Sequence, residues 1–167
     1  MLSVEYLKAK FNLKPLPQEG GYYSESYRSS DKISPENLPQ RYKKEKSFCT
    51  AIYYLLTSGT LSKLHRLPTD EIYHFYLGDP IQMLLLYPGG KSEIVILGSD
   101  IESGHCLQFV VPQNTWQGSF LMEGGTYALM GTTMAPGFDF ADYEPGVYEK
   151  LCREFPDQKM LIKLLTP

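Results

Sequence analysis

Eight short runs rich in β-branched and aromatic residues constrain the fold of this chain more than any other feature. They cover Phe48–Leu56, Leu61–His65, Glu71–Leu77, Ile81–Leu86, Ser92–Leu97, Leu107–Val111, Thr115–Leu121 and Tyr127–Thr133. Turn residues separate the runs, and the string Pro88-Gly89-Gly90 is typical of a hairpin turn. Because almost no helical periodicity lies between the runs, the pattern predicts a β-sandwich or barrel.

Helical patterns are confined to the two ends of the sequence. Ser3 is suited to cap a short N-terminal helix, and two helices are predicted over Val147–Phe155 and Gln158–Leu165. Near the N-terminus, the turn Glu19-Gly20-Gly21 is expected to lead into a strand that ends at Arg28. Residues 31–46 then show neither periodicity nor core residues, and we expect an exposed loop that covers or frames a pocket. We expect residues 1–167 to form one domain.

Composition and charge exclude several classes of partner. The net charge of −3 is nearly balanced, which argues against a nucleic-acid partner. No apolar run has the length of a membrane span, and the first residues lack a signal-peptide pattern, so no membrane partner is expected. Cys49, Cys106 and Cys152 are odd in number and scattered, which favours free buried thiols and a cytoplasmic location.

A spaced set of residues lies around the second and third runs. Gly59 is followed by His65 after five residues, by Glu71 after five more, and by Gly78 after another six. This spacing resembles the first motif of the cupin superfamily, in which a second histidine stands where this chain has Leu67. Four of the five fixed positions therefore match, and the missing position is a metal ligand.

A second, degenerate motif lies downstream. Around Pro112, Asn114 stands at a glycine position of the second cupin motif, and Gln117 stands where the last metal-binding histidine would be. Asn tolerates the positive φ that such a turn requires. Further strings resemble one branch of the superfamily, Cupin_5; they are Pro17–Tyr23 with Ser26–Ser29, Glu71–Tyr76 and Ala135–Asp142. The resemblance implies a mostly β double-stranded β-helix, a jelly roll, with one short N-terminal and two C-terminal helices.

Strand alternation places several polar residues inside this barrel. If His65 points inward, alternation and register carry Glu71, Tyr73 and Phe75 to the interior as well. A lone buried carboxylate is costly, so His65 and Gln117 are the expected partners of Glu71.

The same residues bear on metal binding. The parent cupin set has three imidazoles and one carboxylate, which suits transition metals. Here His65 and Glu71 are the remaining strong ligands and Gln117 is a weak one. We therefore predict no firmly held metal or other cofactor, with weak divalent-metal binding at these three residues as the alternative.

Three functions fit these residues. The resemblance implies first a small-molecule-binding cupin acting as a sugar or nucleotide-sugar isomerase or epimerase. In it His65 would be the base, Glu71 would orient it, and Tyr73 or Tyr127 would deliver the proton. The alternative is a non-catalytic nucleotide-binding, sugar-binding or storage-like cupin. The third is a metal-dependent dioxygenase.

Other residues are candidates for ligand contact. The expected ligand-binding residues are Glu19, Tyr22, Arg28, Phe75, Trp116 and Gln117. Glu19 and Arg28 fit a structural ion pair or a turn stabiliser equally well, and Asp139 fits a residue that holds a rim loop through backbone hydrogen bonds. The strand over Tyr22–Arg28 is suited to pair with a second barrel, so we expect a homodimer.

Overall fold

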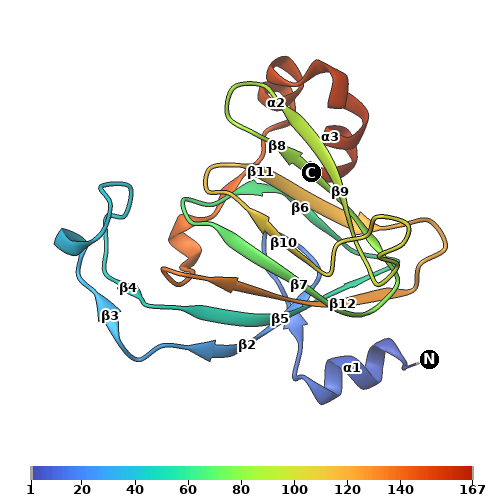
Figure 1. Cartoon of the computed structure of the whole chain (residues 1–167), viewed down its shortest axis with the longest axis horizontal. Coiled ribbons are helices and arrows are strands. Elements are labelled where there is room, and N and C mark those ends of the chain that lie inside the picture. The colour runs from blue at the N-terminus through green and yellow to red at the C-terminus, as the bar shows by residue number, and fades with distance from the viewer. Residues whose placement is uncertain (1, 167) are drawn as a thin grey trace.

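Two antiparallel sheets face each other in the computed structural model, which describes residues 2–166 (Figure 1). The six-stranded sheet contains, in spatial order, β1 (Lys14–Pro15), β2 (Tyr22–Arg28), β5 (Thr50–Thr57), β12 (Tyr127–Met134), β7 (Glu71–Gly78) and β10 (Gln108–Val111). The five-stranded sheet contains β13 (Glu144–Pro145), β6 (Leu61–Arg66), β11 (Trp116–Leu121), β8 (Ile81–Leu86) and β9 (Ser92–Leu97). The predicted jelly roll is confirmed, and each of the eight predicted strands begins and ends within two residues of its expected bounds.

The helices also lie where the sequence predicts them. They are α1 (Val4–Lys10), α2 (Tyr148–Glu154) and α3 (Lys159–Leu165), with short 3₁₀ turns at η1 (Pro35–Asn37), η2 (Phe140–Asp142) and η3 (Pro156–Gln158). The Ser3 hydroxyl accepts a hydrogen bond from the Tyr6 amide and so caps α1 as expected. Asp139 caps η2 by accepting from the Ala141 amide, the rim-loop role predicted for it.

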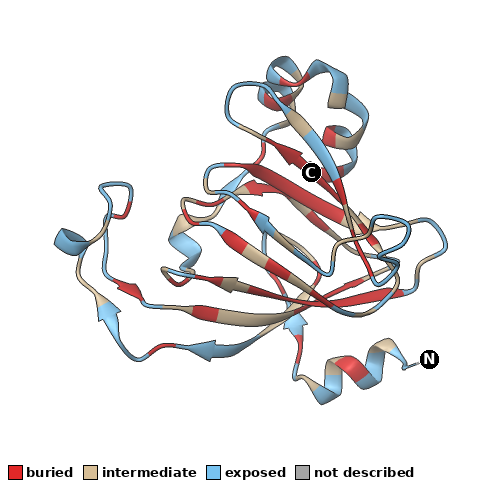
Figure 2. Cartoon of the chain, in the orientation of Figure 1, coloured by how far each residue is buried: buried red, intermediate tan, exposed pale blue. Residues whose placement is uncertain are grey.

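Both faces of each sheet are covered. One apolar cluster lies between the sheets and includes Tyr54, Met83 and Met130. Helix α1 packs on the outer face of the six-stranded sheet, while α2 and α3 pack on the outer face of the five-stranded sheet (Figures 1 and 2). A strand such as β12 is therefore buried on both faces, and its outward side chains are as apolar as its inward ones.

The segment over residues 31–46 is largely exposed, as predicted, but its two ends are paired. It forms a small hairpin arm in which β3 (Lys32–Ile33) pairs with β4 (Lys46–Ser47) (Figure 1). Tyr42 within it is buried. None of its residues lines the barrel pocket described below, so the expectation that it covers or frames that pocket is wrong.

The turn before β11 gives a first testable prediction. Asn114 has a φ of 61°, as its place in the second motif predicts, and its amide donates to the Leu67 carbonyl at 2.7 Å. We expect Asn114→Ala to lower the free energy of unfolding by about 1 kcal/mol, because alanine adopts this left-handed conformation at a cost. Asn114→Gly should be nearly neutral in the same urea titration. An equal loss of stability in both variants would show that the Asn114 side chain, and not the backbone conformation, contributes the stability.

Candidate functional site

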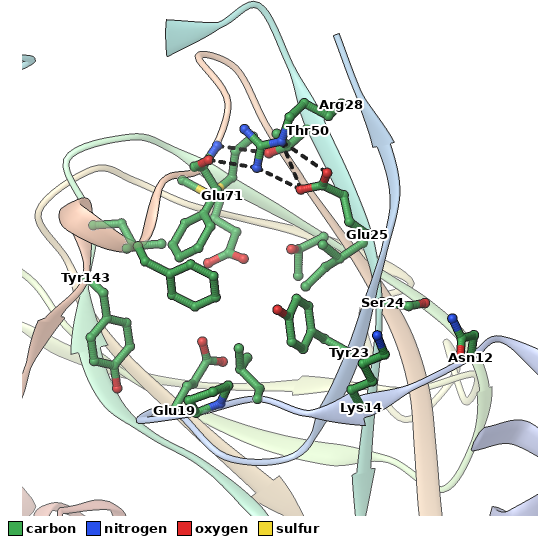
Figure 3. A pocket seen from close by; sticks show the side chains of 18 residues that line it. Asn12, Lys14, Glu19, Tyr23, Ser24, Glu25, Arg28, Thr50, Glu71 and Tyr143 are labelled. Atoms are coloured by element: carbon green, nitrogen blue, oxygen red, sulfur yellow. Dashed lines mark hydrogen bonds and ion pairs between the residues drawn. The ribbon is translucent and has the colours of Figure 1, made fainter. Parts of the chain in front are cut away.

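A cavity of about 390 Å³ lies against the inner face of the six-stranded sheet (Figure 3). Strands β2, β5, β7 and β12 contribute side chains to its wall, and the remaining wall comes from residues 12–19, Leu67 and residues 138–143. A cavity of this volume suits a small organic molecule.

Glu71 is a buried carboxyl group in this wall. It is the first residue of β7, its side chain is 7% exposed, and the Gln117 side-chain amide donates to its Oε2 at 2.8 Å. Burial raises the pKa of the Glu71 carboxyl above its usual value, and the nearby charge of Glu19 raises it further. The Glu71 carboxyl group therefore holds its proton to higher pH than an exposed glutamate does.

Glu19 supplies a second carboxyl group to the same cavity (Figure 3). It lies in the turn before β2, and its backbone carbonyl accepts from the Lys63 amide at 2.9 Å, which ties the turn to β6. The Ser62 hydroxyl donates to its Oε1 at 2.8 Å. Together with Glu25, which pairs with Arg28, three carboxyl groups thus line this cavity.

His65 lies behind Glu19 and is not among the residues that line the cavity. Its side chain is 1% exposed, its ring stacks on Tyr143 at 5.1 Å, and its Nδ1 lies 2.7 Å from the Lys63 carbonyl oxygen. A carbonyl only accepts hydrogen bonds, so Nδ1 carries a hydrogen and Nε2 is left to face Glu19 Oε2 at 3.8 Å. The imidazole therefore contacts Glu19, and Glu19 contacts the cavity.

Tyr73 and Phe75 face the barrel interior as predicted, but they lie in the apolar core and do not line the cavity. Burial raises the pKa of the Tyr73 hydroxyl well above its usual value, and the charges of Glu71 and Glu19 add to this. The Tyr73 hydroxyl therefore keeps its proton throughout the physiological range and is poorly suited to deliver it.

Three predicted site residues point to the outer face of their sheets and not to the barrel interior, where they were predicted. Tyr22 and Tyr127 pack on the outer face of the six-stranded sheet, in the cluster that contains Leu7 of α1. Trp116 packs on the outer face of the five-stranded sheet with α2 and α3. Because side chains alternate along a strand, the residue next to each of these three points inward instead. The placement of Tyr22, Trp116 and Tyr127 in the pocket is corrected accordingly.

Arg28 reaches the pocket rim through an irregularity in β2. The register between β2 and β5 shifts between Glu25 and Tyr27, and this bulge brings Glu25 and Arg28 to the same side. Arg28 Nη2 donates to Glu25 Oε2 at 2.7 Å and to the Phe138 carbonyl at 3.1 Å. Arg28 thus ties β2 to the segment after β12.

Aromatic side chains that sequence reasoning missed form one wall of the cavity. They are Tyr23, Phe138, Phe140 and Tyr143. The rings of Phe138 and Phe140 meet edge to face at 5.2 Å, and Tyr23 meets Phe140 in the same manner at 6.4 Å. Tyr23, Phe138 and Phe140 lie in strings that carry the family resemblance, which was a usable signal, whereas Tyr143 lies just outside them.

The donor atoms at the site fit a resident transition metal poorly. Leu67 stands where a second imidazole would be, and the Gln117 amide is engaged with the carboxyl group of Glu71. Within residues 2–166, no three His, Cys, Asp or Glu side chains are grouped closely enough to hold a metal ion.

Comparisons with known proteins agree with this architecture. A model of the family described as Cupin superfamily (DUF985), Cupin_5, matches residues 5–145. An uncharacterised protein of Saccharomyces cerevisiae is 30% identical, in an alignment covering 75% of this chain and 67% of that protein.

Two solved structures resemble the whole chain. A protein from Shewanella oneidensis is 30% identical with a TM-score of 0.87, and the match covers 100% of this chain and 99% of that one. A hypothetical protein from Leishmania major is also 30% identical with a TM-score of 0.87, covering 99% of each chain. The pocket described above therefore lies in a fold that proteins from distant organisms share.

Two remaining sequence predictions concern the thiols and the membrane. Cys49, Cys106 and Cys152 are free as expected, although they are half-buried and not fully buried. None of the helices within residues 2–166 combines the length and the apolar character that a membrane crossing requires.

Proposed function

Since the chain belongs to the Cupin_5 (DUF985) family of the cupin superfamily, we propose that its barrel pocket binds a hydroxyl-rich small molecule, a sugar or the sugar of a nucleotide-sugar. One observation carries this proposal. The carboxyl groups of Glu19 and Glu71 face the same cavity as an aromatic wall (Figure 3). Carboxylate oxygens accept hydrogen bonds from hydroxyl groups, and aromatic rings pack on the C–H face of a sugar ring.

The charges around the cavity support a neutral ligand group at this position. The lining carries three carboxyl groups, those of Glu19, Glu25 and Glu71, against the cations Lys14 and Arg28, so the cavity as a whole repels an anion. The Arg28 guanidinium is moreover engaged by Glu25. A ligand group that donates hydrogen bonds and carries no charge is not repelled by Glu19 and Glu71, and it does not need the Arg28 guanidinium as a partner. The cavity volume is at the lower end of the range for small-molecule sites, which suits a single sugar unit.

The arrangement also supports proton transfer, and it reassigns the roles inferred from the sequence. Epimerisation removes a proton from a carbon next to a carbonyl group and returns one to the opposite face of that carbon. In the proposed reaction Glu19 takes the proton as the base, and Glu71, whose pKa is raised, returns a proton as the acid. His65 is then a positioning residue, because its buried ring, stacked on Tyr143, packs behind the Glu19 carboxyl group with Nε2 3.8 Å from Oε2.

A second function, binding without turnover, rests on a separate observation. Leu67 lines the cavity where a cupin of the parent pattern supplies an imidazole. An apolar side chain therefore replaces one of the polar side chains that catalysis would use. A nucleotide- or sugar-binding module needs the cavity and its hydrogen-bonding groups and nothing more. The third function, a metal-dependent dioxygenase, needs a donor set that the site does not offer.

A thermal-shift screen against sugars, nucleotides and nucleotide-sugars tests the binding proposal. A ligand at 100 times its dissociation constant stabilises the native state by about 2.7 kcal/mol, so the unfolding midpoint should rise by several degrees. Glu71→Gln and Glu19→Gln should each reduce that rise severalfold. Glu102→Gln, an exposed change of the same type outside the cavity, should leave it intact.

Hydrogen exchange in heavy water distinguishes epimerisation from binding without turnover. If the pocket catalyses epimerisation, a bound keto-sugar exchanges the hydrogen next to its carbonyl for deuterium, and proton NMR detects the loss of that signal. Glu19→Gln should stop the exchange, whereas a binding module shows none with the wild-type chain. Full midpoint shifts in both carboxyl variants would overturn the placement of the ligand in this pocket.

A further inference from the structure

A second cavity, of about 330 Å³, lies next to the barrel pocket. The segment 138–144 separates the two, since its aromatic side chains line the barrel pocket while Asp139, Asp142 and Glu144 line the second cavity. Leu67 contributes to both walls. The second cavity is thus a distinct space bounded by this segment and by the loop before β4.

The lining of the second cavity carries more positive than negative charge. It contains five cationic side chains and three carboxyl groups, in a chain whose net charge is −3. All three carboxyl groups are engaged. Asp142 pairs with the buried Lys46, Glu144 accepts two hydrogen bonds from Arg66 at 2.7 and 2.9 Å, and Asp139 caps η2.

Three cations in the lining have no charged partner among the described residues: Arg41, Lys43 and Lys44. Arg41 Nε donates to the Pro68 carbonyl at 2.8 Å, and Lys43 Nζ donates to the Gln40 carbonyl at 2.7 Å. Neutral carbonyl groups hold these side chains without cancelling their charge. Glu45, the acidic residue of this stretch, pairs with Lys32 instead.

The loop that carries these cations is fixed to the wall of the cavity. Tyr42 is 4% exposed, and its hydroxyl lies 2.7 Å from Thr69 Oγ1 and donates to the Pro68 carbonyl. The Arg41 guanidinium lies over the Tyr42 ring at 4.8 Å, and Lys46 Nζ lies 5.7 Å from the same ring. A fixed loop that crowds like charges around a concave surface is organised to receive an anion before the anion arrives.

From these contacts we infer that the second cavity binds the phosphate group of a small phosphorylated molecule. The guanidinium of Arg41 presents a planar set of donors that matches phosphate oxygens, and Lys43 and Lys44 add point charges. The cavity volume of about 330 Å³ favours a small ligand over an extended polymer. This inference does not rest on the proposed function of the barrel pocket, because a different set of side chains carries it.

Calorimetric titration of the full chain with inorganic pyrophosphate at low ionic strength tests the inference. We expect saturable binding that weakens as salt is added. The triple variant Arg41→Gln, Lys43→Gln, Lys44→Gln should bind at least tenfold more weakly while keeping the wild-type unfolding midpoint. The control variant Lys150→Gln, Lys159→Gln, Lys163→Gln removes three exposed charges from α2 and α3, and it should bind like the wild type.

Further titrations establish where pyrophosphate binds and whether binding is specific. Glu71→Gln should leave pyrophosphate affinity unchanged, and a large change in that variant would place the anion in the barrel pocket and overturn the inference. Equal weakening in the two triple variants would show non-specific attraction by net charge and would also overturn it. Citrate binding as tight as pyrophosphate binding would overturn the assignment to phosphate. If pyrophosphate binds and sugars do not, the inference stands and the proposed function fails.

Discussion

Gly20→Ala is expected to lower the free energy of unfolding by about 3 to 5 kcal/mol, one of the largest effects of any single methyl group in this chain. Gly20 has a φ of 104°, a conformation that other residues adopt only with strain. A Cβ atom at this position would overlap the Leu61 carbonyl oxygen, which belongs to the backbone of β6 and has little freedom to move. Urea unfolding followed by the fluorescence of Trp116, the single tryptophan, measures the loss.

A matched glycine separates strain from overlap. Gly124 has a φ of 81°, but a Cβ atom there would meet no atom within 4 Å. Gly124→Ala should therefore cost about 1 to 2 kcal/mol, the cost of the conformation alone. If the two variants lose the same stability, the close approach of Gly20 to β6 contributes nothing.

The same variant bears on the pocket, since Gly20 follows Glu19. The Gly20 carbonyl accepts from the Tyr54 hydroxyl at 3.0 Å, and the Glu19 carbonyl accepts from the Lys63 amide. Moving this turn away from β6 would displace the Glu19 carboxyl group from Ser62 and His65. We therefore expect Gly20→Ala to weaken ligand binding at temperatures where the variant is still folded.

The strands were predictable from the sequence because turn residues and spacing bound each of them, but the face of each side chain was only partly predictable. Along β7 the motif anchored Glu71, and alternation then carried Tyr73 and Phe75 inward. No such anchor existed on β12, where Tyr127 and its inward neighbour Ala128 are both buried. With helices covering the outer faces of both sheets, apolar character no longer distinguishes inside from outside.

Alternation alone was sufficient to exclude one predicted pair. Trp116 and Gln117 are consecutive on a strand, so their side chains cannot both face the same pocket. In the structure Gln117 points inward, donates to Glu71 and lies opposite His65 in the register of β11 and β6. It is not among the residues that line the cavity, so its predicted contact with a ligand is not direct. In the sequence, the tryptophan was attractive as a ligand contact, but its ring packs against the C-terminal helices and the Arg66 guanidinium.

The position of the aromatic wall was not predictable from periodicity, although Tyr23, Phe138 and Phe140 lie in strings that carry the family resemblance. Phe138, Phe140 and Tyr143 lie between β12 and β13, where the regular structure is limited to the 3₁₀ turn η2. Contacts distant in sequence set the position of this segment. The pairing of Glu144 with Arg66 in β13 and β6 and the hydrogen bond from Arg28 to the Phe138 carbonyl hold that segment. Such contacts follow from the folded barrel and leave no periodic pattern.

Glu71→Gln is expected to stabilise the protein at neutral pH and to lose that advantage in acid. The folded chain raises the pKa of Glu71, chiefly through burial, above the usual value that the unfolded chain retains. Below the unfolded pKa the carboxyl group is protonated in both states and contributes no penalty. As the pH rises through the folded pKa, the native state must ionise a buried group that the unfolded state ionises freely, so wild-type stability falls.

Glutamine removes this penalty, because it is neutral at every pH and still accepts a hydrogen bond from Gln117. Each tenfold difference in proton affinity between the folded and unfolded chain corresponds to about 1.4 kcal/mol, or about 3 to 6 °C in the midpoint of a domain of this size. The midpoint difference between Glu71→Gln and wild type should therefore be small at pH 4 and grow toward pH 8. Glu102→Gln, which removes an exposed carboxyl group, should show no such trend.

The opposite trend would contradict a raised pKa of Glu71 in the folded chain. If Glu71→Gln lost stability relative to wild type as the pH rose, His65 and Gln117 would be stabilising a charged Glu71, and Glu71 could not serve as the acid. If the variant gains stability and also loses ligand-induced stabilisation, the buried carboxyl group of Glu71 lowers the stability of the fold but is needed for ligand binding. That combination is expected of a group held for function, because burial raises its pKa and binding then uses the proton it retains.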